Sequence, residues 1–509
     1  MKKSNMSQDN NITSLVIVGG GSAGWMTAAA LANTLGSQCN ITLIESDDIG
    51  SIGVGEATIP PIKQFNRRLG ISEQDFISHT KGSFKLGIEF IDWGKQGHSY
   101  FHPFGSYGRN FDLVPLHQYW LRDRANGDAA CLDEYSMAWW AAKNNKFALP
   151  IADKKNVLST YDYAYHFDAM AYAKYLRDYS QKRQVTRIQG KVTQVNLNDD
   201  NGFIESVTLA DGESIEADFF IDCSGFRAIL IEGALNTGFE DWSHWLKCDR
   251  AVTVQSENTG PLLPYTRSTA LAAGWQWRIP LQHRTGNGYV YSHRHISDEA
   301  ALASLLQNLD GKPLGEPKLI KFNTGRRKKT WHKNCVAIGL SAGFLEPLES
   351  TSLHLIQTGI DRLLALFPKK NCQPLLSQEY NRITQNEYQS VRDFLILHYC
   401  QTERRDSDFW RECASMPIPE SLQYKIDHFR HSGRLVASDV ELFKNPNWLA
   451  VFVGQLIDVE QYDPLVDARV HLGATEKLSG LRQTMKDVQG IMPDHQQYIN
   501  AYCPMKLKK

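Results

Sequence analysis

The sequence predicts an α/β fold that is built around a nucleotide-binding βαβ unit. Leu15 to Val18 reads as a buried strand, the glycine-rich stretch from Gly19 to Gly24 follows it, and a helix runs from Trp25 to Leu35. A second apolar strand, Ile41 to Ile44, ends in Glu45. Strand, glycines, helix, strand and acid in this order are typical of a dinucleotide-binding unit, because the acid stands where it can reach a ribose.

The glycine-rich loop predicts how the nucleotide is held. Glycines let the backbone approach a pyrophosphate at the helix start, and Glu45 would accept hydrogen bonds from the ribose hydroxyls. This motif does not separate FAD from NAD. The predicted contacts in the unit are Gly19, Gly21, Ser22, Ala23, Gly24 and Glu45. A second glycine-rich loop, Ser51 to Pro60, either closes over the dinucleotide through Gly53, Gly55, Ala57 and Thr58 or is a turn before Pro60 and Pro61.

Composition excludes several classes of protein. With 509 residues the chain has room for two large modules or one elaborated fold. Its 55 Lys and Arg residues balance 56 Asp and Glu residues, so nothing points to nucleic acid or a membrane surface. Nine scattered cysteines without a CxxC pair indicate reduced thiols, no metal site and a reducing compartment such as the cytoplasm. No apolar run predicts a signal peptide or a membrane span, and twelve tryptophans favour a protein that handles a flat ring.

Alternation from Gly82 to Phe90 predicts one strand, with Phe84, Leu86, Ile88 and Phe90 on one face and Lys85 and Glu89 on the other. Lys85 would then be a solvated lysine unless its face lines a cavity. The stretch from His98 to Asn110 carries aromatic residues and two histidines around proline and glycines. It is either a binding loop or an aromatic-rich turn.

The middle of the chain predicts a helix from His166 to Gln181 and then strands, of which Phe219 to Ile221 ends in Asp222. Trp275 and Trp277 lie two residues apart and therefore on one face of an extended strand. The two indoles either form the wall of a cavity or pack within the sheet. Asn287-Gly288 predicts the turn of a hairpin before Tyr289 and Tyr291.

From Asn334 to Phe367 the pattern predicts a strand (Cys335 to Ile338), a break at Gly339 and Gly343, and a helix entered through Glu349, Ser350, Thr351 and Ser352. Hydroxyl residues at a helix start cap free backbone N–H groups, and the same groups form a site for a small anion. Both interpretations stay open on the residues alone. A polar helix from about Gln378 to Cys413 carries an apolar stripe of Val391, Phe394, Leu395 and His398, and the last hundred residues are expected to be mostly helical.

Taken together these stretches resemble the flavin-dependent halogenases of the tryptophan halogenase family over nearly the whole chain. The family's marks occur in its order as GGGSAGW at 19–25, GVGEATIP at 53–60, the lysine of FKLGIEF, WQWRIP at 275–280 and FLEPLEST at 344–351. WxWxIP is the most specific of them. The resemblance implies an FAD-binding Rossmann-like module of the GR2 type over 1–395, like that of flavoprotein monooxygenases, with inserted segments that face the substrate. It also implies a mostly helical substrate-binding module that is completed by 396–509.

The resemblance also implies a mechanism. Reduced FAD, oxygen and halide give hypohalous acid, which moves to a separate substrate pocket. Lys85 would receive it through a hydrogen bond or as a haloamine, and Glu349 would stabilise the cationic ring, take its proton or orient the electrophile. Trp275 and Trp277 would keep the substrate away from the flavin. The remaining implied contacts are Gly55, Ala57, Thr58, Asp222, Gly339 and Ser350 for FAD and the N–H groups of Thr351 and Ser352 for halide.

Departures from the family pattern bear on the substrate. Enzymes that act on free tryptophan carry Gly after Glu-Ser-Thr, where this chain has Ser352, so we hypothesise a shift toward bromide. Their tyrosine pair and acid for the amino-acid group are not found between Cys400 and Asn447. His102 and Phe104 match their ring-stacking positions and Phe443 stands for their tryptophan. The expected substrate is therefore an indole or a similar electron-rich aromatic that is bound without that carboxylate clamp of the protein.

A separate flavin reductase is the expected partner, because no second nucleotide motif would bind a nicotinamide coenzyme; a homodimer is compatible with the sequence. One alternative is an FAD-dependent aromatic monooxygenase, which shares the βαβ unit but needs neither the two tryptophans nor Lys85. A second alternative is a flavin-binding protein without turnover. Such a protein would not need Lys85, Glu349 and the two tryptophans in combination.

Overall fold

The computed structural model describes residues 10–46, 55–110, 112–127 and 129–506, apart from the side chains of 470 and 471. Of the second glycine-rich loop, residues 51–54 with Gly53 lie outside the described residues, whereas Gly55, Ala57 and Thr58 lie within them. Among the described residues, no helix is long and apolar enough to cross a membrane.

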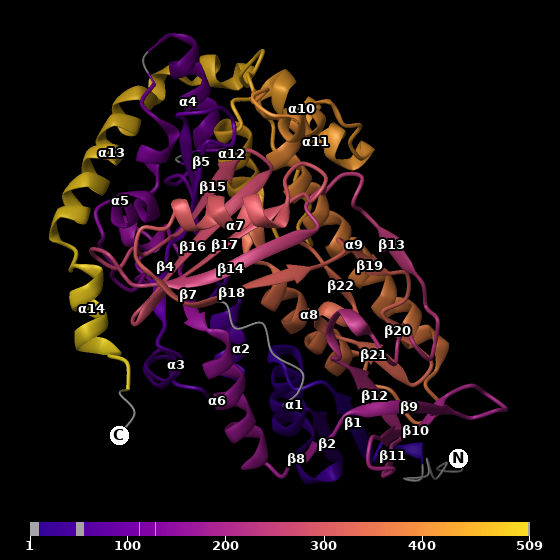
Figure 1. Cartoon of the computed structure of the whole chain (residues 1–509). Coiled ribbons are helices and arrows are strands. Elements are labelled where there is room, and N and C mark those ends of the chain that lie inside the picture. The colour runs from indigo at the N-terminus through magenta and orange to yellow at the C-terminus, as the bar shows by residue number, and fades with distance from the viewer. Residues whose placement is uncertain (1–9, 47–54, 111, 128, 507–509) are drawn as a thin grey trace, which may run out of the picture.

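A six-stranded sheet forms the lower part of the molecule in Figure 1 and contains the predicted βαβ unit. Its central strand β1 pairs in parallel with β2 and β12, and helix α1 (Ser22–Leu35) crosses between β1 and β2. Leu15 to Val18 are all buried, which agrees with the continuous apolar run. In spatial order the strands are β20 (Trp331–His332), β21 (Cys335–Ala337), β12 (Phe219–Asp222), β1 (Ser14–Val18), β2 (Asn40–Glu45) and β8 (Thr186–Gln189).

A seven-stranded, mainly antiparallel sheet lies above it in the middle of Figure 1. In spatial order its strands are β18 (Pro313–Lys321), β14 (Arg250–Ser256), β17 (Arg284–Tyr291), β16 (Gly274–Leu281), β15 (Thr266–Leu271), β5 (Gly87–Ile91) and β6 (Ser99–Pro103). Three small sheets complete the β structure: β11 (Ser214–Glu216), β10 (Ile204–Leu209) and β9 (Val192–Leu197); β13 (Phe239–Asp241), β19 (Gly325–Arg327) and β22 (Gly343–Phe344); and β3 (Gly55–Ala57), β7 (Ala164–Asp168) and β4 (Ser83–Lys85).

Two strand predictions are wrong in an informative way. The stretch from Gly82 to Phe90 is two strands, β4 and β5, that belong to different sheets and are separated by Leu86. Asn287-Gly288 is no turn but lies inside β17, opposite Trp277 of β16. A Cβ atom on Gly288 would stand 2.2 Å from the Trp277 ring, so this glycine makes room for an indole.

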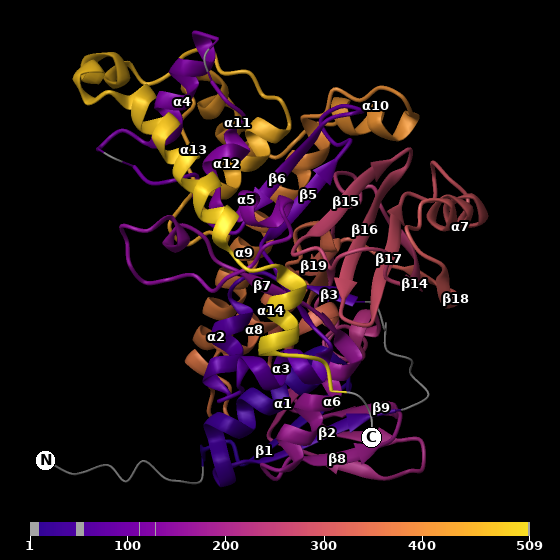
Figure 2. The ribbon, with the colours of Figure 1, turned by 90° about the vertical axis from the view of Figure 1, so that its left-hand side faces the viewer.

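The helices divide between the two ends of the molecule in Figure 2. Near the six-stranded sheet lie α1, α2 (Ile62–Arg68), α3 (Glu73–Thr80), α6 (Ala169–Gln181), α8 (Ser352–Ala365) and α14 (His495–Tyr502). At the other end lie α4 (Leu116–Ala125), α5 (Met137–Lys143), α10 (Asp408–Ser415), α11 (Glu420–Ser432), α12 (Asn445–Gly454) and α13 (Ala474–Ile491), while the long α9 (Pro374–Cys400) runs between the ends and α7 (Asp298–Gln307) covers the large sheet.

Helix boundaries differ from the sequence prediction at three places. The predicted helix start at His166 is wrong, because His166 lies on β7 and α6 begins at Ala169, where Asp168 caps two backbone N–H groups. The single helix expected to reach Cys413 is α9 followed by a separate α10. Helix α8 begins at Ser352 after a 3₁₀ turn, Pro347–Glu349.

Two large hydrophobic clusters hold the molecule together. One packs α1, α6 and α8 against the six-stranded sheet, and the other packs α9 to α12 against the large sheet. Helices α4 and α5 contact α13, so chain segments before and after residue 395 build the helical end together. The rigid packing of both clusters fixes the space between the two sheets, where the site lies.

Candidate active site

A cavity of about 1750 Å³ opens between the two large sheets. The glycine-rich loop after β1, the indoles of Trp275 and Trp277 and the start of α8 line it. Eight of the predicted cofactor residues reach this cavity, namely Gly19, Gly21, Ser22, Ala23, Glu45, Gly55, Ala57 and Ser350. Residues from both glycine-rich loops and from the Asn334–Phe367 stretch therefore meet in one place.

The glycine-rich loop fits a dinucleotide. Gly19 has a φ of +119°, and a Cβ atom there would stand 2.1 Å from the Cys223 carbonyl oxygen. A Cβ atom on Gly20 would stand 1.7 Å from Glu45 Oε2. No side chain caps α1 at its N-cap residue Gly21, which leaves the first N–H groups of the helix free for an anion. These features match a pyrophosphate at the helix start.

Glu45 lies at the carboxyl end of β2 as predicted, but it already has protein partners. Its Oε2 accepts a hydrogen bond from Trp25 Nε1 at 3.1 Å, and its Oε1 accepts one from Arg187 Nε. Arg177 Nη1 lies 3.9 Å from the same oxygen. The carboxylate is thus fixed in place before any ribose reaches it.

Four predicted cofactor residues lie behind the cavity wall, where each has a structural contact. A Cβ atom on Gly24 would meet the Gly19 carbonyl oxygen at 1.8 Å, and one on Gly339 would meet Ala23 at 2.7 Å. Thr58 exchanges hydrogen bonds with the backbone of β7. The Asp222 carboxylate accepts hydrogen bonds from the backbone N–H groups of residues 224, 230 and 231 and so holds the loop after β12.

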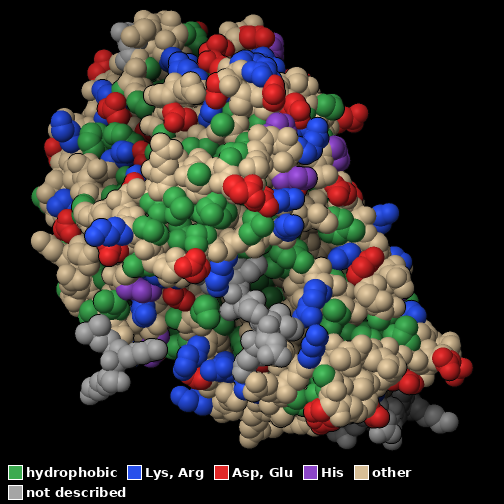
Figure 3. Space-filling view, in the orientation of Figure 1, with side chains coloured by type: hydrophobic (Ala, Val, Ile, Leu, Met, Phe, Trp, Pro, Cys, Tyr) green, Lys and Arg blue, Asp and Glu red, His purple; other side chains and the backbone are tan. Residues whose placement is uncertain are grey.

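Basic side chains gather along the cavity. Figure 3 shows Lys and Arg side chains on both sides of the hollow on the face it draws. Those that line the cavity include Lys174, Arg177, Lys191, Arg227 and Lys318. Acidic side chains such as Glu56, Asp75 and Asp168 line the cavity too, but Lys and Arg residues outnumber them, and an excess of positive charge favours a phosphate-bearing cofactor.

Lys85 is fully buried, which rules out the alternative of a solvated strand lysine. Its Nζ donates to the Thr58 carbonyl oxygen at 3.0 Å and to Ser350 Oγ at 2.8 Å, and it lies 5.0 Å from the centre of the Phe104 ring. Burial lowers the pKa of Lys85 to about 7 although the charge of Glu349 opposes this. Glu89, predicted on the same face, instead pairs with Lys143 at 2.6 Å.

Glu349 is also fully buried and lies between two histidines. His102 Nδ1 is 2.9 Å from Oε2 and 3.0 Å from Oε1 of Glu349, and His398 Nε2 is 2.9 Å from Oε1. Burial by itself would raise the pKa of Glu349, but the two imidazoles outweigh it and hold this pKa at about 2. The next residue, Ser350, has a φ of +59° and turns the chain so that it contacts Lys85 and the cavity.

The start of α8 is open. The N-cap residue Thr351 makes no side-chain cap, so the expected hydroxyl capping is absent. Thr351 Oγ1 is buried and has no hydrogen-bond partner among the described residues. Ser352 lines the cavity next to it. Backbone N–H groups without protein partners at the start of a helix are a ready site for an anion.

The two tryptophans of β16 lie on one face, as predicted, with ring centres 6.0 Å apart. Trp275 Nε1 donates to Glu346 Oε2 at 3.0 Å, and Tyr399 donates to the same oxygen at 2.9 Å. Burial raises the pKa of Glu346 to about 7, although these two hydrogen bonds lower it. Trp93 packs behind Trp275 at 6.3 Å between ring centres.

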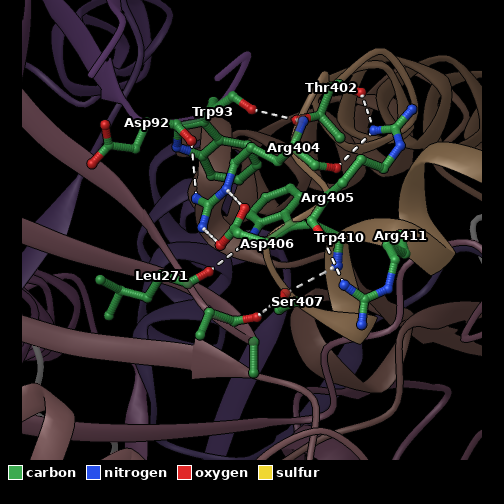
Figure 4. A network of polar contacts seen from close by, with 12 residues as sticks. Asp92, Trp93, Leu271, Thr402, Arg404, Arg405, Asp406, Ser407, Trp410 and Arg411 are labelled. Atoms are coloured by element: carbon green, nitrogen blue, oxygen red, sulfur yellow. Dashed lines mark hydrogen bonds and ion pairs between the residues drawn. The ribbon is translucent and has the colours of Figure 1, made fainter. Parts of the chain in front are cut away.

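A polar network supports Trp93 from the loop between α9 and α10 (Figure 4). Thr402 Oγ1 donates to the Trp93 carbonyl oxygen, and Arg404 pairs with Asp406 and lies 4.6 Å from the Trp410 ring. Trp410 Nε1 in turn donates to the Leu271 carbonyl oxygen of β15. The network ties α10 to the large sheet and holds the tryptophan wall from behind.

Of the predicted substrate residues His102, Phe104 and Phe443, only His102 contacts Glu349 directly. Phe443 stacks on Phe394 at 3.8 Å between ring centres, and His102 lies 6.3 Å from Phe443. Phe104 lies beside Lys85. His102 therefore has a polar role beside its predicted stacking role, because its imidazole contacts Glu349.

Sequence reasoning missed two residues of this site. His398 was interpreted only as part of an apolar stripe, yet it contacts Glu349. Glu346 precedes Pro347 in the same FLEPLEST segment, yet only the fold shows that it holds Trp275. A histidine within an otherwise apolar helical stripe was the one available signal for His398.

Comparison with known proteins decides the family. The profile of the family described as tryptophan halogenase matches residues 14–471. The chain belongs to the tryptophan halogenase family. The tryptophan 6-halogenase SttH of Streptomyces toxytricini is 36% identical in an alignment of 443 positions that covers 82% of this chain and 84% of that protein. The tryptophan 7-halogenase KtzQ of Kutzneria sp. is 33% identical over 96% of this chain and 98% of its own length.

Solved structures of flavin-dependent halogenases share the fold. Xcc4156 from Xanthomonas campestris superposes with a TM-score of 0.94 at 43% identity and covers 98% of this chain and 100% of its own. BrvH from Brevundimonas sp. BAL3 superposes with a TM-score of 0.93 at 46% identity and covers 97% of this chain and 99% of its own. The protein is an FAD-dependent halogenase, and FAD and halide are the ligands that its family implies.

Proposed function

We propose that this halogenase uses reduced FAD from a separate flavin reductase to make hypohalous acid, and that it halogenates an electron-rich aromatic such as an indole. The observation that carries the proposal is Lys85. Its buried amine contacts Ser350, which lines the large cavity, while the preceding residue Glu349 faces the aromatic cluster. A lysine between this cavity and the aromatic residues could receive an electrophilic halogen from the cavity side and offer it to a ring on the other side.

The chain's own groups divide the chemistry. Bound FAD would lie along Gly19 to Ala23 and supply, with oxygen and halide, the hypohalous acid. The open N–H groups at Thr351 and Ser352 would bind the halide. Because its pKa is about 7, Lys85 can act as an ammonium that donates a hydrogen bond to hypohalous acid, or as an amine that takes the halogen while the oxygen–halogen bond breaks and the amine proton leaves with the hydroxide as water. The Glu349 carboxylate, with its pKa of about 2, would stabilise the cationic ring and accept its proton.

The substrate is proposed to be an aromatic compound that the protein binds by its ring, without a clamp for an amino-acid group. His102, Phe104 and Phe443 would contact the ring, since aromatic side chains bind flat apolar ligands through stacking and edge contacts. The described residues from Cys400 to Asn447 contain one tyrosine, Tyr424, and it is 57% exposed. This supports the absence of the tyrosine pair that would bind a substrate amino-acid group.

A product screen tests the proposal. The protein, a generic flavin reductase, NADH and either chloride or bromide are incubated with indoles, phenols and free tryptophan, and products are identified by mass spectrometry. Halogenated indole at a rate well above halogenated tryptophan is expected. Equal rates for free tryptophan and indole would contradict the proposed substrate. A hydroxylated product without halide would contradict halogenation as the activity.

The Lys85→Ala variant tests the role of the lysine. Halogenation should be lost while reduced FAD is still oxidised, because the large cavity is formed by other residues. Lys486→Ala on the exposed side of α13 is the matched control and should retain both activities. Halogenation by Lys85→Ala at the original rate would defeat the assigned role.

Bromide preference is tested through Ser352. The hydroxymethyl group stands at the proposed halide site, where the free-tryptophan enzymes have glycine. In a competition with equal chloride and bromide, bromination should dominate, and Ser352→Gly should increase the share of chlorinated product. Dominant chlorination by the unmodified protein would refute the preference.

A further inference from the structure

The protonation states of the two histidines around Glu349 can be derived from their other contacts. His398 lies on α9, and its Nδ1 is 2.9 Å from the carbonyl oxygen of Phe394, one helical turn earlier. A carbonyl oxygen can only accept a hydrogen bond. Nδ1 of His398 therefore carries a proton.

The other ring nitrogen of His398 faces the carboxylate. Nε2 lies 2.9 Å from Glu349 Oε1, and both side chains are buried. Nε2 has no aligned hydrogen-bond partner among the described residues, but a neutral His398 with its proton on Nδ1 would still place a lone pair 2.9 Å from a carboxylate oxygen in a buried site, which is costly. A proton on Nε2 or on Oε1 removes this repulsion, so we infer that one of these two atoms carries it.

His102 is fixed differently, through Asn447. The backbone N–H of Lys444 donates to Asn447 Oδ1 at 2.7 Å, so the amide turns its NH₂ group to His102 Nε2 at 2.9 Å. His102 Nε2 is therefore an acceptor, and the proton of a neutral His102 lies on Nδ1, which donates to Glu349. His102 is thus a neutral hydrogen-bond donor to Glu349, whereas the pair of His398 and Glu349 holds one further proton.

The surroundings of His398 favour the charge on the histidine. Its ring centre lies 4.8 Å from that of Phe90 and 5.9 Å from that of Trp93, and aromatic rings attract cations. Glu349 meanwhile receives a hydrogen bond from His102, which stabilises the ionised carboxylate. Both effects favour an imidazolium beside a carboxylate over a neutral pair.

We propose that His398 is a positively charged positioning residue that keeps the Glu349 carboxylate ionised and fixed, so that Lys85 needs no permanent ion pair with Glu349. This inference rests on the proposed function. An ionised Glu349 can accept the proton that leaves the halogenated ring carbon, while the electrons of that C–H bond return to the ring. Because His398 balances the carboxylate, Lys85 is available as a neutral amine for the halogen.

Nitrogen NMR tests the charge without any turnover. Protein with ¹⁵N-labelled histidine is measured at pH 7 without cofactor, and the His398→Gln and His102→Gln variants assign the two rings. Both nitrogens of His398 should show the chemical shifts of protonated imidazolium, and His102 should show one unprotonated nitrogen. An unprotonated Nε2 on His398 would overturn the proposal even if halogenation is observed.

Kinetics then separate charge from hydrogen bonding. Gln at position 398 can donate to Glu349 but carries no charge, whereas Leu can do neither. Both His398→Gln and His398→Leu should lower kcat for aromatic halogenation at least tenfold, while free hypohalous acid, trapped by a chromogenic acceptor, forms at the original rate. Wild-type kcat in His398→Gln would refute the need for charge.

His295→Gln is the matched control, because His295 Nε2 also lies near a glutamate, 3.4 Å from Glu412 Oε1 beside α10. It should leave the kcat for aromatic halogenation and hypohalous acid formation unchanged, and a loss equal to that of His398→Gln would overturn the assignment. Failure of the unmodified protein to form hypohalous acid would contradict the proposed function instead, and the NMR result would still decide the charge of His398.

Discussion

Replacing Lys85 by methionine should make the protein more stable at neutral pH while abolishing halogenation. The ordinary pKa of lysine is 10.5, and burial lowers that of Lys85 to about 7. The unfolded chain therefore binds the proton more tightly than the folded protein between these values, so the stability of the unmodified protein rises as pH increases from 7 to 10.5. By the same linkage, burying this amine costs roughly 4 kcal/mol at pH 7 and roughly 2 kcal/mol at pH 9.

Methionine removes that cost but also removes two hydrogen bonds, to Thr58 and Ser350, worth about 1 kcal/mol each. The variant should therefore gain roughly 2 kcal/mol at pH 7 and almost nothing at pH 9. Urea unfolding followed by tryptophan fluorescence at both pH values measures the difference. Lys486→Met, on the solvent side of α13, is the control and should show no such change with pH. An equal gain at both pH values, or a loss at pH 7, would refute the reasoning.

Three further predictions concern neighbouring groups. Burial raises the pKa of Glu346 from an ordinary 4.5 to about 7. The folded state therefore binds this proton more tightly than the unfolded chain, and the stability of the protein falls as pH rises from 4.5 to 7. Glu346→Gln should raise the thermal midpoint at pH 8 but not at pH 5. Gly20→Ala places a Cβ atom against Glu45 and should weaken FAD binding at least tenfold by fluorescence titration, whereas Gly490→Ala, with open space around it, should not. Glu349→Gln should lower halogenation about a hundredfold or more with hypohalous acid formation retained, because general acid–base groups contribute about 10² to 10⁴ in rate.

Local patterns predicted much of the fold. The βαβ unit was recoverable because hydrophobic runs, glycines and the acid of one short stretch contact each other. The tryptophan pair lies on one face because a strand alternates its side chains, whatever else packs on it. Errors arose where a distant contact overrides the local signal. Gly288 looks like a turn glycine until Trp277 is seen to occupy its space.

The sequence by itself determined the cofactor loop and the order of the family's motifs. Only the tertiary structure decided the state of the reactive groups. Lys85 and Glu349 are ordinary charged residues by periodicity. The pKa of Lys85 depends on its burial and on Glu349, and that of Glu349 depends on its burial and on His102 and His398, which come from another strand and another helix. A local pattern reports on neighbours along the chain, whereas the charge of a buried group is set by neighbours in space.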